Sequence, residues 1–206
     1  DPLAEVLVGT ACTAYVDAMT GRAAEASRRL REALRSEKDT EPAQRLWALT
    51  RLAEIEERRG ARSEAEAAYR EALALGRRDV YLQAAYADFL LDQRRPAEVL
   101  TLLTDGARAD VLLLRLAIAA KATGDARAAG WARELQARFD ATSARGDTTH
   151  RKEEARFALA VQGEPARALA LARENADAFV VDTTGHSVEE IVDAIAGQLG
   201  HGKVDG

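Results

Sequence analysis

A short pattern of large, small, polar and large side chains recurs along the chain at a spacing of 34 residues. It reads Leu52-Ala53-x-Ile55 and returns as Tyr86-Ala87-x-Phe89, and a compressed copy follows at Leu116-Ala117-x-Ala119. A fixed period of this length is typical of helix-pair repeats, in which each pair has too little core alone and packs on its neighbours. The pattern therefore predicts a stacked array of helices.

Turn residues divide this array into pairs. A glycine, which adopts the left-handed conformation at little cost, follows a helical apolar pattern at Gly21, Gly60, Gly124 and Gly163. In the third pair Arg94-Arg95 takes the place of the glycine. Pro96 and Pro165 stand where a second helix should begin, and proline is tolerated in a first helical turn.

The spacing predicts five antiparallel hairpins, because the connections are short. They pair residues 4–19 with 22–36, 43–59 with 62–75, 79–93 with 96–105, 109–122 with 125–144, and 148–162 with 165–175. In the second hairpin we expect Ala53 and Ala65 to make the close helix contact. Leu52, Tyr69 and Leu73 are then left to pack on the next hairpin.

Composition supports an all-α fold and excludes several functions. The 206 residues include 45 Ala and 25 Arg but only 4 Ile, a balance that favours helices over strands. The net charge of −5 comes from interspersed acids and bases, so we expect no nucleic-acid-binding face. The apolar runs are too short to span a membrane. The single cysteine, Cys12, forms no internal disulfide, and its small neighbours predict a buried side chain.

The C-terminal part departs from the repeat pattern. We place the array in residues 1–176 and a separate tail in residues 177–206. The segment from Ala178 to Thr184 is strand-like, and Ser187 to Glu190 forms a capping box before an amphipathic helix. The preferred interpretation is a cap over the last repeat, and a foreign segment joined to the array remains an alternative.

No motif for catalysis, metal or cofactor binding is complete. Gly197 to Lys203 matches G-x-x-x-x-G-K, but Val204 replaces the hydroxyl that would hold Mg²⁺, and the run follows a helix instead of opening one. The three histidines, His150, His186 and His201, have no second ligand at metal-binding spacing. Adjacent carboxylates such as Glu56 and Glu57 are interpreted as solvated helix faces, and Glu54 has Arg58 at ion-pair spacing. We therefore expect no catalytic residue, no metal and no cofactor.

The second hairpin resembles a tetratricopeptide repeat. Its residues Leu49-x-x-Leu52-Ala53-x-Ile55, Gly60 and Ala65-x-x-x-Tyr69-x-x-Ala72-Leu73 match the family pattern at nearly every position. The chain departs from the pattern at Gly76-Arg77, where the family often has proline, and at Gly106, where it has alanine. The resemblance covers residues 4–175. It implies a right-handed superhelical solenoid that binds a segment of a partner protein in its concave groove, without catalysis.

The resemblance also implies which side chains line that groove. Most aromatic residues, such as Tyr86, Phe89 and Trp131, are interpreted as core, whereas Trp47 and Tyr81 are expected at a groove entrance. The entrance would lead to an acidic middle, which favours a basic partner segment, and to an apolar end. The expected groove residues are Trp47, Thr50, Glu54, Glu57, Arg58, Tyr81, Ala84, Asp88, Leu91, Asp92, Val111, Leu114, Ile118 and Lys121.

Two alternative functions remain open from the sequence. The tail resembles the closing strand and helix of small P-loop kinases, which would make the chain a fragment or accessory of a phosphotransferase. A self-associating spacer is the other, since the end faces of helical arrays invite stacking. The array further resembles exported bacterial tetratricopeptide proteins, which implies a periplasmic or exported location; without that resemblance a cytoplasmic location is expected.

Overall fold

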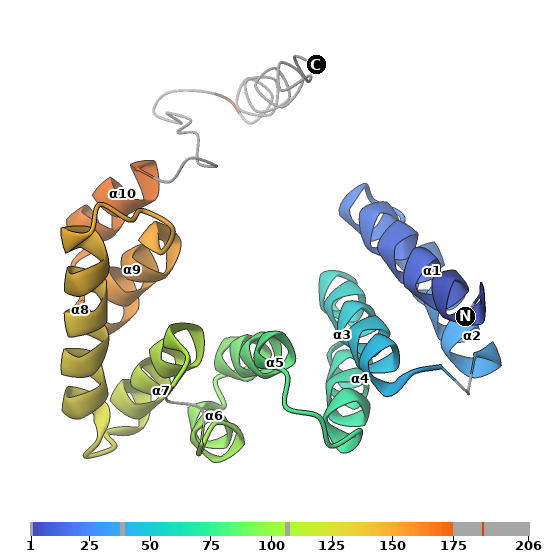
Figure 1. The fold of residues 1–206 in the computed structure, drawn as a ribbon, viewed down its shortest axis with the longest axis horizontal. Helices are drawn as coiled ribbons and strands as arrows, with labels where there is room; N and C mark the ends of the chain where they lie inside the picture. The colour runs from blue at the N-terminus through green and yellow to red at the C-terminus, as the bar shows by residue number, and fades with distance from the viewer. Residues whose placement is uncertain (1, 38–39, 106–107, 175–186, 188–206) are drawn as a thin grey trace. The chain divides into compact units, whose positions relative to one another are not determined.

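The chain is helical throughout the part that the structure describes. This computed structural model describes residues 2–37, 40–105, 108–174 and 187, and within them it contains helices and no strand. The all-α prediction is confirmed for these residues. The helices are α1 (Pro2–Met19), α2 (Ala23–Ser36), α3 (Pro42–Arg58), α4 (Arg62–Ala74), α5 (Val80–Asp92), α6 (Pro96–Leu102), α7 (Asp110–Thr123), α8 (Ala128–Ala144), α9 (Arg151–Phe157), the π-helical segment η1 (Ala158–Gln162) and α10 (Pro165–Arg173) (Figure 1).

The predicted helix bounds are confirmed to within three residues at each end. The largest differences are three residues each: α6 ends at Leu102 instead of residue 105, α8 begins at Ala128 instead of residue 125, and α9 begins at Arg151 instead of residue 148. Pro96 and Pro165 each start a helix, as the sequence predicts. The first helix of the fifth pair is divided, because α9 continues into the π-helical segment η1.

Every predicted hairpin turn contains a residue in the left-handed conformation. The φ angles are 91° at Gly21, 72° at Gly60, 58° at Arg94, 69° at Gly124 and 76° at Gly163. The prediction that Arg94-Arg95 replaces the turn glycine is therefore confirmed. Because a side chain makes this conformation unfavourable, Arg94 is held there by the same turn geometry that the four glycines adopt freely.

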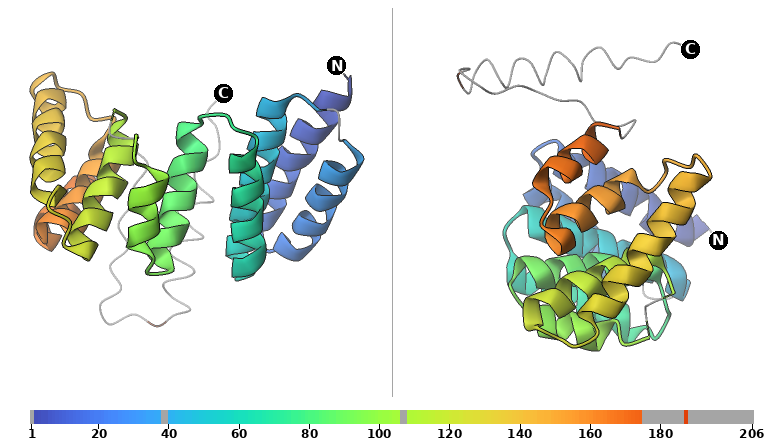
Figure 2. Two further views of the ribbon diagram at one scale, coloured as in Figure 1. Left: turned by 90° about the horizontal axis from the view of Figure 1, so that it is seen from below. Right: turned by 90° about the vertical axis from the view of Figure 1, so that its left-hand side faces the viewer.

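Residues 1–138 form one of two compact units, and its helices pack in two layers. Within it α1 contacts α2, α3 contacts α4 and α5 contacts α6, so each hairpin is paired (Figures 1 and 2). The first helices α1, α3, α5 and α7 also contact one another in order along one side. Helices α2, α4 and α6 lie on the other side, and each contacts the first helix of the following hairpin.

Small residues allow the helices to approach, and aromatic rings join successive hairpins. Ala53 and Ala65 are fully buried, as a close helix contact requires. Tyr69 on α4 stacks on Tyr86 of α5 with ring centres 5.2 Å apart and lies 5.8 Å from Phe89. The predicted role of Tyr69 in packing on the next hairpin is confirmed, and Tyr86 and Phe89 are core residues as expected.

A buried carboxylate connects α2 to α3. The Glu56 side chain is fully buried, so the interpretation of this residue as part of a solvated face is wrong. It accepts hydrogen bonds from the Ser27 hydroxyl and from the guanidinium groups of Arg31, at 2.9 Å, and Arg59. The physical reason is that α2 covers this face of α3 and supplies the partners that a buried charge needs.

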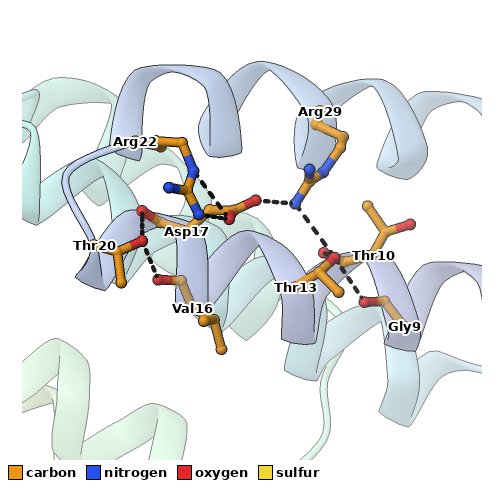
Figure 3. Close-up of polar contacts among 8 residues, drawn as sticks. All are labelled: Gly9, Thr10, Thr13, Val16, Asp17, Thr20, Arg22 and Arg29. Atoms are coloured by element: carbon orange, nitrogen blue, oxygen red, sulfur yellow. Dashed lines mark hydrogen bonds and ion pairs between the residues drawn. The ribbon is translucent and has the colours of Figure 1, made fainter.

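A second polar cluster joins α1 to α2 (Figure 3). Asp17 accepts from Arg22, across the turn, and from Arg29, whose Nη2 lies 2.7 Å from its carboxylate. Hydrogen bonds from these two guanidinium groups hold the pKa of Asp17 below its usual value. Arg29 also donates to the Thr13 hydroxyl at 3.3 Å. Both carboxylate oxygens of Asp17 thereby accept from arginines of the same hairpin, so the cluster holds α1 against α2.

The second compact unit comprises residues 139–206, of which the structure describes 139–174 and 187. The Phe139 and Phe157 rings pack at 5.7 Å, and Glu154 pairs with Arg151 at 2.8 Å and with Arg167 at 3.1 Å. The predicted boundary at residue 176 and the strand-like tail lie outside the described residues, apart from Ser187, and stay predictions.

Cys12 is exposed on α1, so the prediction of a buried cysteine is wrong. It is surrounded in sequence by small residues, but only Ala11 and Ala14 of these neighbours face the core. Helical geometry turns Cys12 about 100° away from Ala11, toward the exposed side. None of the described helices combines the length and the apolar character that crossing a bilayer would require.

Candidate functional site

The candidate site is the face that the first helices α1, α3 and α5 present, and it has two parts. The first is an aromatic cage of Tyr15, Trp47 and Tyr81 around Arg51. The second is an acidic row, which we define as Glu54, Glu57, Asp88 and Asp92 on α3 and α5. All of these residues belong to the unit formed by residues 1–138.

Arg51 lies within reach of three aromatic rings from three helices. Its guanidinium carbon is 4.8 Å from the centre of the Tyr15 ring on α1, 5.6 Å from that of Trp47 on α3 and 4.6 Å from that of Tyr81 on α5. Arg58, about two helical turns after Arg51 on α3, lies 5.8 Å from the Tyr15 ring. A cation within about 6 Å of a ring centre is attracted to the ring face, so the cage connects three hairpins through one positive charge.

Glu54 joins the cage to the acidic row. Its carboxylate pairs with Arg51 at 2.9 Å and accepts a hydrogen bond from the Tyr81 hydroxyl. Burial raises the pKa of Glu54, against the opposing effects of Tyr81, Arg51 and Arg58. Burial and the bond to Glu54 raise the pKa of Tyr81 to about 12, so its hydroxyl stays protonated as a donor. The ion pair of Glu54 is with Arg51, and not with Arg58 as its spacing suggested.

Glu57 is a partly buried carboxylate of the row that has no positively charged partner within the described residues. It accepts a hydrogen bond from the Tyr69 hydroxyl and forms no ion pair within the described residues. Burial is the main cause that raises its pKa, and the negative charges of Glu54, Asp92 and Asp88 raise it further. The surroundings of Glu57 therefore favour an added positive charge. Glu54 and Glu57 are partly buried, so the interpretation of adjacent carboxylates on this helix as a solvated face is wrong for these two residues as well.

Asp88, by contrast, is held by a neighbouring helix. It pairs with Arg115 of α7, a buried residue that also donates to the carbonyl of Ala84 at 3.2 Å and of Val111 at 2.7 Å. Arg115 thereby connects α5 and α7. The acidic row consequently ends, on the α7 side, in an internal ion pair.

The structure divides the fourteen expected groove residues into three groups. Three are buried and present no side chain to a ligand: Thr50, Ala84 and Leu114. Seven are partly buried: Trp47, Glu54, Glu57, Asp88, Leu91, Val111 and Ile118. Four are exposed: Arg58, Tyr81, Asp92 and Lys121. Thr50 donates to the carbonyl of Leu46 at 2.8 Å within its own helix.

Sequence reasoning missed Tyr15, Arg51 and Arg115, and it predicted Tyr69 as a packing residue without its hydrogen bond to Glu57. The signal for Arg51 was present, because Trp47, Arg51, Glu54 and Arg58 are spaced by four, three and four residues and share one helix stripe. Tyr15 and Arg115 carried no comparable signal. Their roles depend on which helix packs beside α3 or α5, and that is a tertiary property.

The described residues contain no group of three or more histidine, cysteine, aspartate or glutamate side chains arranged to hold a metal. The chemistry available on the face is the binding of cations by carboxylates and ring faces. The phosphate-loop-like run from Gly197 to Lys203, together with His186 and His201, lies outside the described residues.

Comparisons with protein-family models, with curated proteins and with solved structures give no significant match to this chain.

Proposed function

We propose that the chain is a tetratricopeptide-type scaffold that binds a basic segment of another protein on the face formed by α1, α3 and α5. In this proposal the helix pairs stack into a right-handed solenoid, and this face is its concave groove. The alternating contacts of first and second helices and the left-handed residue in each turn support a repeat of one structural unit. Binding is noncovalent and needs no cofactor.

The single observation that carries the proposal is the environment of Glu57. This partly buried carboxylate has three further carboxylates as electrostatic neighbours and no ion pair within the described chain. A lysine or arginine of a partner would offset both the burial and the repulsion, and the gain is larger here than at a solvated surface because the effective dielectric is lower.

The aromatic side chains add contact area beside this carboxylate. Tyr81 keeps 48% of its surface exposed although its ring already contacts Arg51, and Trp47 is partly buried next to it. Tyrosine and tryptophan supply large, rigid contacts and are enriched among the residues that dominate binding energy. A partner chain with arginines between apolar residues matches both parts of the face.

The test is fluorescence anisotropy with two labelled peptides of equal length, one alternating Arg and Leu and the other alternating Glu and Leu. The full chain is expected to bind the basic peptide and not the acidic one. Glu57→Gln should weaken the basic peptide about tenfold, the effect of losing one partly buried charge contact. Equal binding of both peptides would show that the face is not selective for positive charge.

A matched variant distinguishes binding at Glu57 from a general effect of the net charge of the chain. Glu32 on α2 is exposed and has no ion pair within the described residues, so Glu32→Gln removes the same charge at a different place. We expect its affinity for the basic peptide to stay within about twofold of the unaltered chain, because exposed charges are screened. If both variants weaken binding equally, attraction is general and the site assignment is incorrect.

A second candidate function is self-association through α1. Helix α1 exposes Val6 at 51%, Val16 at 60% and Met19 at 55%, and Val16 and Met19 lie within one helical turn of each other. Exposed apolar side chains that lie close together are typical of an interface. Sedimentation that gives a monomer at every concentration would exclude this function, whereas a concentration-dependent dimer that Val16→Asp abolishes would support it.

A further inference from the structure

A pocket on the opposite layer of the first unit carries an independent inference. It lies where α2, α3 and α4 meet, has a volume of about 230 Å³, and its lining includes Arg31, Arg35 and Arg45. We propose that this pocket binds the free C-terminal carboxylate of a peptide that ends in an apolar residue.

The positive charges around the pocket exceed the negative charges that hold them. Arg45 pairs with Glu71 at 2.9 Å, and Arg31 pairs with the buried Glu56 at 2.9 Å. Glu56 is shared, however, because Arg59 pairs with the same carboxylate. Gathering like charges costs free energy, and a bound anion reduces this cost.

Arg35 is the lining arginine whose positive charge is not paired with a carboxylate of the described residues. It lies one helical turn after Arg31 on α2, lines the pocket and forms no hydrogen bond or ion pair within the described residues. Arg45 donates from Nη1 to the carbonyl of Leu34 at 3.0 Å, which fixes its guanidinium at the pocket wall. Arg45 and Arg35 could therefore both donate to one carboxylate, because each guanidinium presents paired N–H groups that match the two oxygens of a carboxylate.

The remaining lining limits what the carboxylate is attached to. Leu34, Leu49 and Leu52 form an apolar wall, and Glu71 is the carboxylate among the lining residues. Pockets for drug-sized ligands have volumes of about 300–1,000 Å³, so this smaller one suits a single residue. A phosphate alone would leave the leucine wall without a contact, whereas an apolar residue with a carboxylate uses both surfaces.

The test follows the arginine Nε–Hε signals of the ¹⁵N-labelled full chain by NMR. The probes are N-acetyl-leucine, which has a free carboxylate, N-acetyl-leucinamide, which has none, and N-acetyl-glutamic acid α-amide, which has only the side-chain carboxylate. We expect saturable shifts at Arg31, Arg35 and Arg45 with N-acetyl-leucine and none with the leucinamide. N-acetyl-glutamic acid α-amide should bind more weakly than N-acetyl-leucine, and tighter binding of the glutamic acid probe would overturn the proposal.

Two variants of exposed α2 arginines complete the experiment. Arg35→Gln should weaken the binding of N-acetyl-leucine about tenfold, as expected for the loss of a charge-assisted hydrogen bond. Arg28→Gln, on the same helix but outside the pocket lining, should leave the affinity within about twofold, since exposed charges act weakly at a distance. Equal shifts with the leucinamide, an absence of saturable shifts, or unchanged binding in Arg35→Gln would each overturn the proposal.

Discussion

The guanidinium carbon of Arg51 lies 4.6 Å from the centre of the Tyr81 ring, so one charge on α3 is held against an exposed aromatic side chain on α5. The same guanidinium carbon lies 4.8 Å from the centre of the Tyr15 ring of α1. Arg51 is therefore a connection between three consecutive hairpins as well as part of the candidate binding face. Because Arg51 has both roles, only a conservative substitution of this residue can separate its effect on stability from its effect on binding.

The first prediction concerns this connection. Arg51→Ala should lower the free energy of unfolding by about 1–2 kcal/mol, because it removes the cation–π contacts and leaves Glu54 without its ion pair. Arg51→Lys keeps the charge and should recover about half of the loss. Urea denaturation measures both. The control Arg62→Ala, at an exposed position of α4, should stay within about 0.5 kcal/mol of the unaltered chain.

The second prediction concerns the turn between α5 and α6. Arg94→Gly should stabilise the chain by about 1 kcal/mol, because glycine adopts the φ of 58° without the steric cost of a side chain. Gly124→Ala, in the corresponding turn after α7, should destabilise by a similar amount. Thermal denaturation of the two variants should therefore shift in opposite directions. A lower midpoint for Arg94→Gly would contradict the equivalence of these turns.

The third prediction concerns the buried carboxylate between α2 and α3. Glu56→Ala should destabilise by about 2–4 kcal/mol, since it leaves two partly buried guanidinium groups without their acceptor. Ser27→Ala removes one donor and should cost only about 1 kcal/mol. Denaturant unfolding distinguishes the two. A loss for Glu56→Ala no larger than that for an exposed glutamate such as Glu32 would show that this network contributes little.

The fourth prediction is a pH dependence at Glu57. Burial raises its pKa above the usual 4.5, so the folded chain binds this proton more tightly than the unfolded chain does. The contribution of Glu57 to stability is therefore largest at low pH and is lost as the pH rises from 4.5 through the raised pKa. Glu57→Gln should remove this part of the decline. Denaturant unfolding at a series of pH values measures it, with Glu32→Gln as the control expected to keep the decline.

The same proton competes with a basic partner. Because only the ionised carboxylate attracts a cation, affinity for the Arg-Leu peptide should fall as the pH is lowered through the raised pKa of Glu57. Glu57→Gln should bind weakly and with a flatter profile. A peptide affinity that rises on acidification would be incompatible with a role for this carboxylate.

The fold was predictable because helix ends and repeat spacing are local properties. Gly60 and Pro96 lie at a helix end and a helix start in the sequence and in the structure. Even the replacement of a turn glycine by Arg94 could be located, since the residues around it keep the period of the repeat. Cys12 was misplaced because small neighbours indicate close packing without indicating which side of the helix packs.

The face was predictable only in part, because its electrostatics depend on contacts between helices. The positions of Trp47 and Tyr81 in the repeat were enough to predict both residues as part of the face. The position of the Arg51 guanidinium beside their rings could not be predicted from the repeat. Glu56 and Glu57 are adjacent in sequence, yet one is fully buried against α2 and the other is partly buried beside α5. Such a difference is decided by the packing partner of each helix side and not by the composition of the helix.

The measurement that tests the central claim most directly is binding of the labelled Arg-Leu peptide to the chain in which Trp47 and Tyr81 are both changed to alanine. Circular dichroism first establishes that the helix content is unchanged. We expect affinity to fall at least tenfold, as expected for the removal of two aromatic binding residues, while the charges of the face remain in place. An affinity equal to that of the unaltered chain would contradict the assignment of the α1, α3 and α5 face as the binding surface.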